Sequence, residues 1–132
     1  MSGEKPMLSC PFCSLDPAKL IAGDALTMTV RDTLPVSPGH TLVLPRRHIA
    51  SIFDATREEV SSLWDAVQAA RRDLLKQFSP DGFNIGVNDG LASGQTILHL
   101  HIHLIPRYNG DMPDPRGGIR WIFPEKAKYW KD

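Results

Sequence analysis

The most regular hydrophobic pattern in the chain lies at residues 99–105, where polar and apolar side chains alternate. The stretch is His99-Leu100-His101-Ile102-His103-Leu104-Ile105. Because successive side chains of an extended strand point to opposite faces, the alternation predicts a strand with three imidazoles on one face and aliphatic residues on the other. Imidazole titrates near neutral pH and ligates metals, so this face is the first candidate for chemistry.

A helical period replaces this alternation at residues 56–78. Apolar side chains recur there mostly on one stripe: Val60, Leu63, Trp64, Val67, Leu74, Leu75 and Phe78. Thr56 with Glu59 three residues later forms a capping-box pattern at the start, and Pro80 marks the end. We therefore expect one long helix whose stripe, Trp64 and Phe78 included, belongs to the core.

Shorter patterns predict the remaining elements. Strands are expected at 20–22 and 25–31, joined by a turn at Gly23-Asp24, then at 40–45 and at 83–88. The last of these precedes the histidine strand, so the two form an antiparallel hairpin. Residues 1–9 are expected to be a loose lead-in, and Asp16-Pro17 to open a single helical turn. After Pro106 we expect an irregular tail with a short strand at 119–123 and a helical end near 124–130.

Composition narrows the function classes. A length of 132 residues is typical of one domain, so we expect a single domain over 1–132. Fifteen basic residues balance fifteen acidic ones, which favours neither a polynucleotide partner nor a membrane surface. The N-terminal residues lack the apolar core of a signal peptide, and no apolar run approaches the roughly 20 residues that span a bilayer. We expect a cytoplasmic protein.

Cys10-Pro-Phe-Cys13 admits three interpretations: a thiol redox pair, half of a zinc site, or two incidental residues. A redox pair of thioredoxin type follows a strand and opens a helix, whereas the nine residues before Cys10 do not resemble a strand. Half of a tetrahedral zinc site is the favoured hypothesis, provided that two further ligands lie elsewhere in the chain. His40 and His48, at opposite ends of one predicted strand, are expected to serve different sites.

The loop at residues 88–96 is rich in small and polar residues. Its amide, hydroxyl and backbone N–H groups suit phosphate oxygens, and it leads directly into the histidine strand. Phe12 and Ile21 are candidates for a surface that lines a nucleobase.

Several of these features together resemble the histidine-triad (HIT) family of nucleotide hydrolases and transferases. The resemblance runs from Cys10 to about Arg107. It rests on His99–Ile105, Asp32 ahead of Pro38-Gly39-His40, the strand end Leu42-Val-Leu-Pro-Arg-Arg-His48, Asn88-Asp-Gly90 and Gly94-Gln-Thr96. The two cysteines make the chain similar to the bacterial zinc-carrying, diadenosine polyphosphate hydrolase-like branch. This resemblance implies an α+β fold, with an antiparallel sheet of about five strands and one long helix, and a two-fold homodimer.

The resemblance also implies a mechanism. His101 would attack the α-phosphorus of a nucleotide, form a covalent nucleotidyl-histidine and release the monophosphate to water. His103 and His40 would donate hydrogen bonds to the nonbridging oxygens. The positions that match substrate contacts are Asp32 for the ribose hydroxyls, and Asn88, Thr96 and His103 for phosphate or leaving group. Gln95 matches the glutamine of the substrate-binding loop.

A closed metal site follows from the same resemblance. Its ligands would be Cys10, Cys13, His48 and His99. Four protein ligands imply a structural zinc ion, with no organic cofactor. The implied substrate is a purine nucleotide such as a dinucleoside polyphosphate or a nucleoside phosphoramidate, and the choice of leaving group is expected to depend on the variable tail at 107–132.

Three alternatives remain open on the sequence alone. The three alternating histidines could ligate one catalytic zinc of a metallohydrolase, although three ligands in a row strain tetrahedral geometry. The pocket could bind nucleotide for signalling without turnover. A thiol redox function would require Cys10 and no metal.

Overall fold

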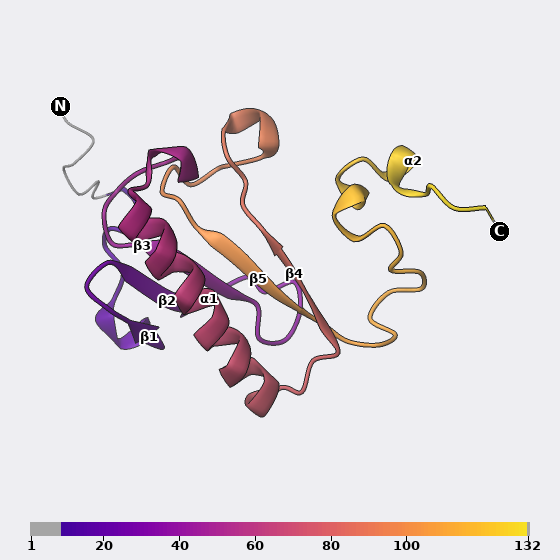
Figure 1. Cartoon of the computed structure of the whole chain (residues 1–132), viewed down its shortest axis with the longest axis horizontal. Coiled ribbons are helices and arrows are strands. Elements are labelled where there is room, and N and C mark those ends of the chain that lie inside the picture. Colours follow the sequence, from indigo (N-terminus) through magenta and orange to yellow (C-terminus); the bar gives the residue numbers. More distant parts are fainter. Residues whose placement is uncertain (1–8, 132) are drawn as a thin grey trace.

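Five strands form one antiparallel sheet with a long helix across one face (Figure 1). The computed structural model describes residues 9–131, so the expected lead-in lies, apart from Ser9, outside the described residues. The elements are β1 (Ala22–Gly23), β2 (Thr27–Arg31), β3 (Thr41–Pro45), α1 (Arg57–Gln77), β4 (Gly82–Gly86), β5 (Ile102–Arg107) and α2 (Pro124–Ala127). The strand order is β1-β2-β3-β5-β4, and each neighbouring pair is antiparallel. The predicted α+β fold and the β4–β5 hairpin are confirmed.

Helix α1 begins and ends where the capping signals predict. The Thr56 side chain accepts the Glu59 N–H, and the Glu59 carboxylate accepts the Thr56 N–H. Its inward face buries Leu63, Val67, Ala70 and Leu74 against the sheet. The predicted burial of Trp64 and Phe78 is wrong, since they are 41% and 37% exposed. A single sheet covers only one side of the helix, and Trp64 lies about 100° around the axis from Leu63.

The capping box gives a first prediction. Thr56→Ala is expected to lower the free energy of unfolding by about 1 kcal/mol, because it removes the side-chain acceptor of the Glu59 N–H. Urea denaturation measures this loss. Thr33→Ala, at an exposed position outside the helix, is the matched control, and an equal effect of both substitutions would contradict the role of the cap.

The histidine strand keeps its predicted alternation but begins later than predicted. Leu100, Ile102 and Leu104 are buried in the core beneath α1. Sheet pairing starts only at Ile102, opposite Val43 of β3. The Leu100 N–H instead bonds to the Ile49 carbonyl in the loop after β3. His99 and His101 therefore lie in the segment that leads into β5 rather than within the strand.

Two further boundaries differ from prediction. The hairpin between β1 and β2 turns at residues 24–26, because the Asp24 carboxylate accepts the backbone N–H groups of Leu26 and Thr27. The segment predicted as a strand at 119–123 is instead a 3-10 helix, Gly118–Ile122. Gly117 and Gly118 both have positive φ, which turns the chain out of an extended path.

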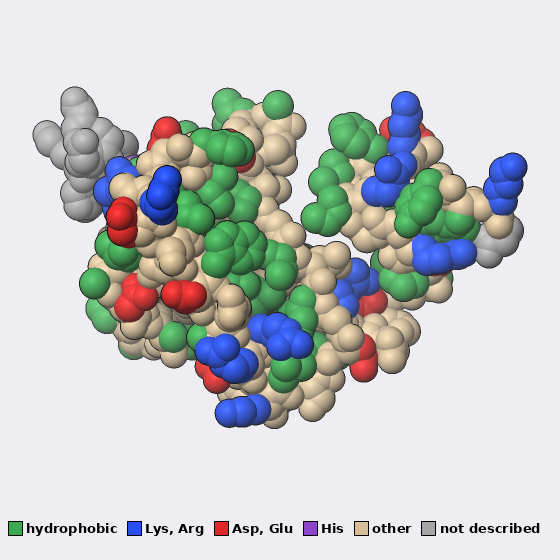
Figure 2. Space-filling view, in the orientation of Figure 1, with side chains coloured by type: hydrophobic (Ala, Val, Ile, Leu, Met, Phe, Trp, Pro, Cys, Tyr) green, Lys and Arg blue, Asp and Glu red, His purple; other side chains and the backbone are tan. Residues whose placement is uncertain are grey.

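The C-terminal arm, residues 108–131, extends away from the sheet and carries α2 (Figure 1). Figure 2 shows a hollow between the arm and the main body, with hydrophobic side chains on the edge of the arm that faces it. The arm returns toward the sheet near Gly118, where a Cβ would meet the Asn84 amide nitrogen at 3.5 Å. No helix within residues 9–131 has the length and apolar character needed to cross a membrane.

Candidate active site and metal centre

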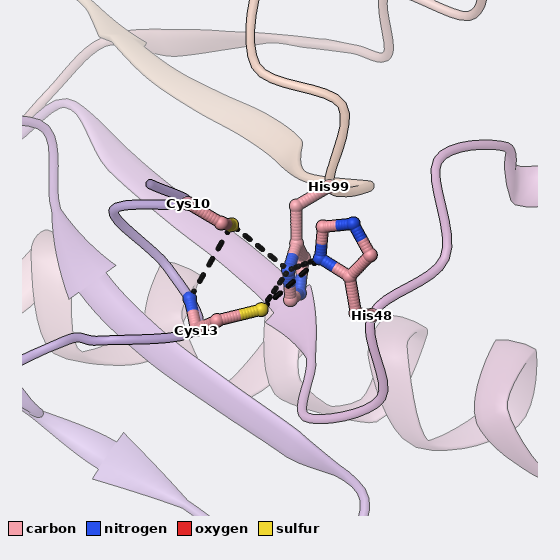
Figure 3. Close-up of side chains that lie close together, drawn as sticks. All are labelled: Cys10, Cys13, His48 and His99. Carbon is pink, nitrogen blue, oxygen red and sulfur yellow. Dashed lines mark hydrogen bonds between the residues drawn. The ribbon is translucent and has the colours of Figure 1, made fainter. Parts of the chain in front are cut away.

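Two cysteines and two histidines converge beside the N-terminal end of β5 (Figure 3). Cys10 and Cys13 come from the first turn of the described chain, His48 follows β3, and His99 precedes β5. The Cys13 Sγ lies 3.0 Å from His48 Nδ1, the two Nδ1 atoms are 3.2 Å apart, and Cys10 Sγ lies 3.6 Å from His99 Nδ1. Tetrahedral zinc with Zn–N of about 2.0 Å and Zn–S of about 2.3 Å requires similar ligand separations. These residues could therefore hold one metal ion.

A backbone carbonyl orients the buried ligand of this set. The His99 Nε2 lies 2.8 Å from the Pro45 carbonyl oxygen, which can only accept a hydrogen bond. Nε2 therefore carries the proton, and the lone pair of Nδ1 points at the cysteines. Burial lowers the pKa of His99, so the ring is kept in the neutral form that binds metal.

A second backbone carbonyl orients His101. The His101 Nδ1 lies 2.8 Å from the His99 carbonyl oxygen, so Nδ1 is the donor and Nε2 keeps an unprotonated lone pair. The Phe12 ring packs between the two histidines, with centroids 5.1 Å from His101 and 5.7 Å from His99. His101 thus presents an unprotonated ring nitrogen beside the cysteine–histidine cluster but outside it.

His40 and His103 form a chain of hydrogen bonds. The Val36 N–H donates to His40 Nδ1 at 3.2 Å, which places the His40 proton on Nε2. That Nε2–H donates to His103 Nδ1 at 3.0 Å, so the remaining proton of His103 is on Nε2. Asp32 Oδ2 lies 3.5 Å from His40 Nε2. This chain of hydrogen bonds leaves His103 as a neutral hydrogen-bond donor.

The turn before β3 sets the position of His40. Gly39 has φ +88°, and a Cβ there would lie 2.8 Å from the Leu74 Cδ2 of α1. Glycine is required both by the backbone conformation and by this close approach. The Pro38-Gly39-His40 segment therefore fixes the imidazole against the sheet.

The low pKa values of these histidines predict acid lability. Burial, reinforced by neighbouring His101 and His40 and opposed by Asp32, lowers the pKa of His103 to about 4. Between about pH 6.5 and 4 the unfolded chain binds a proton at this position and the folded chain does not, so stability is full above pH 6.5 and falls as the pH decreases. We expect urea midpoints to fall over this range, and His103→Gln to reduce the slope. An unchanged slope in the variant would contradict the assignment.

A cavity of about 590 Å³ adjoins His101 on the sheet face opposite α1. Its apolar walls include Phe12, Leu15, Val30, Leu42 and Ile97, and Asp32 lies among its polar lining residues. Phe12 lines this cavity as predicted. Ile21 does not, and this prediction is wrong: Ile21 lies beside α1 residues on the other side of the sheet. Ile21 directly precedes β1, which β2 and β3 separate from β5, so it lies far from the histidines.

The sequence between residues 15 and 110 matches the HIT domain family. The chain belongs to this family. It is 39% identical over 80 residues to the asymmetrical bis(5'-nucleosyl)-tetraphosphatase of Schizosaccharomyces pombe, and 38% identical over 86 residues to the bis(5'-adenosyl)-triphosphatase of Dictyostelium discoideum. These matches cover 61% and 65% of this chain but only 44% and 58% of the relatives. The chain thus spans about half the length of these curated relatives.

Solved structures agree with the HIT fold. A zinc-bound histidine triad family protein from Mycobacterium smegmatis superposes with a TM-score of 0.71 at 34% identity, covering 86% of this chain and 90% of that one. A HIT family protein from Bacillus subtilis gives a TM-score of 0.70 at 31% identity, covering 77% and 75%. The zinc-bound relative is consistent with a metal at the cysteine–histidine cluster.

The three loop residues singled out in this HIT chain occupy different environments. Gln95 is buried, and its side chain bonds to the Gly90 N–H and to the Ala50 and Ile97 carbonyls. It holds the loop in shape, so a contact to phosphate would require it to give up one of these bonds. Asn88 lies beside His40 and His103, whereas Thr96 is exposed on the loop.

The three alternating histidines of the HIT motif do not converge on one ion. His99 faces the cysteines, and His101 donates to the His99 carbonyl. His103 accepts from the His40 ring. Among the described residues, neither cluster of potential ligands contains all three. The arrangement therefore gives no support to a catalytic zinc held by the triad. Sequence reasoning missed the orienting backbone groups, the Pro45 and His99 carbonyls and the Val36 N–H, because no side-chain pattern signals them.

Proposed function

We propose that the protein is a nucleotide hydrolase or nucleotidyl transferase that acts at an α-phosphate through a covalent nucleotidyl-histidine on His101. The observation that carries the proposal is the unprotonated Nε2 of His101, oriented by the His99 carbonyl beside a cavity large enough for a nucleoside. The relatives named for bis(5'-nucleosyl)-tetraphosphatase and bis(5'-adenosyl)-triphosphatase activities support it. The substrate is a purine nucleotide with a leaving group on its α-phosphorus.

The first step forms a bond between Nε2 of His101 and phosphorus and breaks the bond to the leaving group. Water then cleaves the phosphorus–nitrogen bond and releases the nucleoside monophosphate, so one displacement is divided into two. The Nε2–H of His103, held in place by His40, donates to a nonbridging oxygen as charge shifts there. Both histidines are neutral because burial lowers their pKa values.

The remaining site residues bind rather than react. Asp32 lines the nucleoside cavity and offers carboxylate oxygens to the ribose hydroxyls. Asn88 and Thr96 contact the phosphate or leaving group from the loop, and Gln95 shapes that loop and reaches the phosphate when it exchanges one backbone bond.

A single zinc ion held by Cys10, Cys13, His48 and His99 is structural in this proposal. Four protein ligands leave no position for substrate. The ion ties the first turn of the chain to the two loops of His48 and His99, and that turn carries Phe12, which packs against His101. The metal thus stabilises one wall of the nucleoside cavity.

The proposed assembly is a homodimer of two copies of the chain. β4 is an edge strand with Ile85 39% exposed, and Trp64 of α1 is 41% exposed. An exposed edge strand and a large aromatic side chain are features of surfaces that associate.

Turnover assays test the proposal directly. Release of adenosine monophosphate is measured from diadenosine tetraphosphate and from adenosine 5′-phosphoramidate, with and without a chelator, while circular dichroism monitors folding. We expect cleavage that survives chelation as long as the protein stays folded. Loss of turnover in folded, metal-free protein would favour a metallohydrolase, and binding of adenosine monophosphate without cleavage of either substrate would favour a binding module.

A further inference from the structure

The turn that carries His40 is tied by two hydrogen bonds to the segment in which β5 ends. The Ser37 hydroxyl donates to the Pro106 carbonyl at 2.7 Å. The Tyr108 hydroxyl donates to the Pro38 carbonyl at 2.6 Å, although the two residues are 70 positions apart in the sequence. Because Tyr108 is the first residue of the C-terminal arm, the arm is in direct contact with the turn before β3.

The Pro38 carbonyl belongs to the peptide unit in front of Gly39, where the backbone rotates most easily. Gly39 has φ +88°, and glycine adopts positive and negative φ about equally readily. On the other side of this residue, the Gly39 carbonyl accepts the Thr41 hydroxyl at 2.7 Å. The hydroxyls of Tyr108 and Thr41 therefore hold both peptide units next to Gly39 and oppose a rotation that would move His40.

The imidazole of His40 depends on this turn for both of its hydrogen bonds. Its Nδ1 accepts the Val36 N–H at 3.2 Å within the turn, and its Nε2–H reaches His103 Nδ1 of β5 at 3.0 Å. A rotation of the turn would misalign at least one of these pairs, and a hydrogen bond weakens steeply when its angle falls. His103 would then no longer be restricted to the tautomer that carries its proton on Nε2.

The backbone around Tyr108 is fixed on both sides of the residue. The Tyr108 N–H donates to the Asp111 carboxylate at 3.0 Å, and Asp111 also accepts two hydrogen bonds from Arg107. The Asn109 N–H donates to the Asp81 carboxylate at 2.8 Å. Burial, together with the nearby charge of Asp81, raises the pKa of Tyr108, so the hydroxyl keeps the proton that it donates.

We propose that Tyr108 is a positioning residue that holds His40, and through it His103, in the arrangement that nucleotidyl transfer uses. The inference rests on the proposed function and adds a residue of the C-terminal arm to it. Tyr108 lines neither the nucleoside cavity nor the cavity beside His40 and His103, so it acts through the Pro38 carbonyl and not by contact with substrate. A shift of the arm at its first residue reaches the site histidines by this route.

Removal of one oxygen atom tests this role. Tyr108→Phe deletes the hydroxyl and keeps the ring. Tyr129→Phe is the matched control, because Tyr129 is 70% exposed and its hydroxyl forms no hydrogen bond to a described residue. A neutral hydrogen bond changes an equilibrium by about 2- to 10-fold, so we expect Tyr108→Phe to lower kcat by about 3- to 10-fold and to change KM by less than about 2-fold. Both are measured with diadenosine tetraphosphate or adenosine 5′-phosphoramidate, whichever the wild-type protein cleaves faster, and Tyr129→Phe should change neither.

Two further measurements separate positioning from a general effect on folding. Nitrogen-15 NMR spectra of the histidine side chains report which ring nitrogen carries the proton. We expect His103 to change from a single Nε2–H tautomer to a mixture in Tyr108→Phe but not in Tyr129→Phe. In a His40→Ala background, Tyr108→Phe should cause no further loss of kcat, because the hydroxyl acts through His40 and the two effects are not additive.

The outcomes separate the positioning role from the proposed function. The role of Tyr108 is overturned by an unchanged His103 tautomer, by a rise in KM at constant kcat, or by an equal loss of kcat in the His40→Ala background. If folded wild-type protein cleaves neither substrate, the proposed nucleotidyl transfer fails. The tautomer spectra, which need no turnover, then still decide whether Tyr108 holds His40.

Discussion

Replacement of His101 by alanine is expected to lower kcat by about 10³-fold or more, because it removes the nitrogen that we propose attacks phosphorus. In the structure Nδ1 donates to the His99 carbonyl at 2.8 Å, so Nε2 is the nitrogen that keeps a lone pair. The measurement is release of nucleoside monophosphate under single-turnover conditions. Mass spectrometry of acid-quenched wild-type protein should show a nucleotidyl adduct, and the His101→Ala protein should show none.

His103→Ala is the informative comparison for this variant. It removes a hydrogen-bond donor rather than the nucleophile, so we expect a loss of about 10²- to 10³-fold in kcat while the adduct still forms. Thermal melting of both variants separates chemistry from folding. If His101→Ala retains turnover within 10-fold of the wild-type protein, the covalent mechanism is wrong, and a direct attack by water would replace it.

The alternation predicted correctly that the aliphatic side chains of this stretch are buried, whereas a functional role for the histidines stays a prediction. The sequence could not show where sheet pairing begins, since that depends on the register of β3. Opposite β5, β3 pairs over Thr41–Val43 only, and the chain before Ile102 bonds to Ile49 instead. This late start allows His99 to face the cysteines while His103 faces His40.

The burial of side chains along α1 was likewise only partly predictable from the sequence. The helical period identified the stripe, but the width of its buried part depends on how much of the helix the sheet covers. Leu63 is fully buried, whereas the adjacent Trp64 is 41% exposed. In the same way, the tautomers of the site histidines depend on backbone carbonyls that come from other segments, such as Pro45 at the end of β3.

Loss of one thiolate ligand is expected to be the most damaging change to stability. Cys10→Ala removes a buried side chain of the proposed zinc site, 3.6 Å from His99 Nδ1, so we expect the variant to bind no zinc and to lose about 4 kcal/mol or more of unfolding free energy. For a domain of this size that corresponds to a fall in Tm of about 10 °C or more. Metal content and thermal melting, measured on the same samples, test the expectation.

A chelator provides the control that separates the metal from the side chain. Wild-type protein treated with a chelator should melt near the temperature of Cys10→Ala, and the chelator should cause no further loss in the variant, because both act on one ion. Since Phe12 packs against His101 from the same turn, metal-free protein that is still folded should show a higher KM and a kcat within 10-fold of the holoprotein. Cys10→Ala protein could instead show the whole expected loss of unfolding free energy and still bind one zinc ion. That result would assign the effect to the packing of Cys10 in the core, where it is 7% exposed.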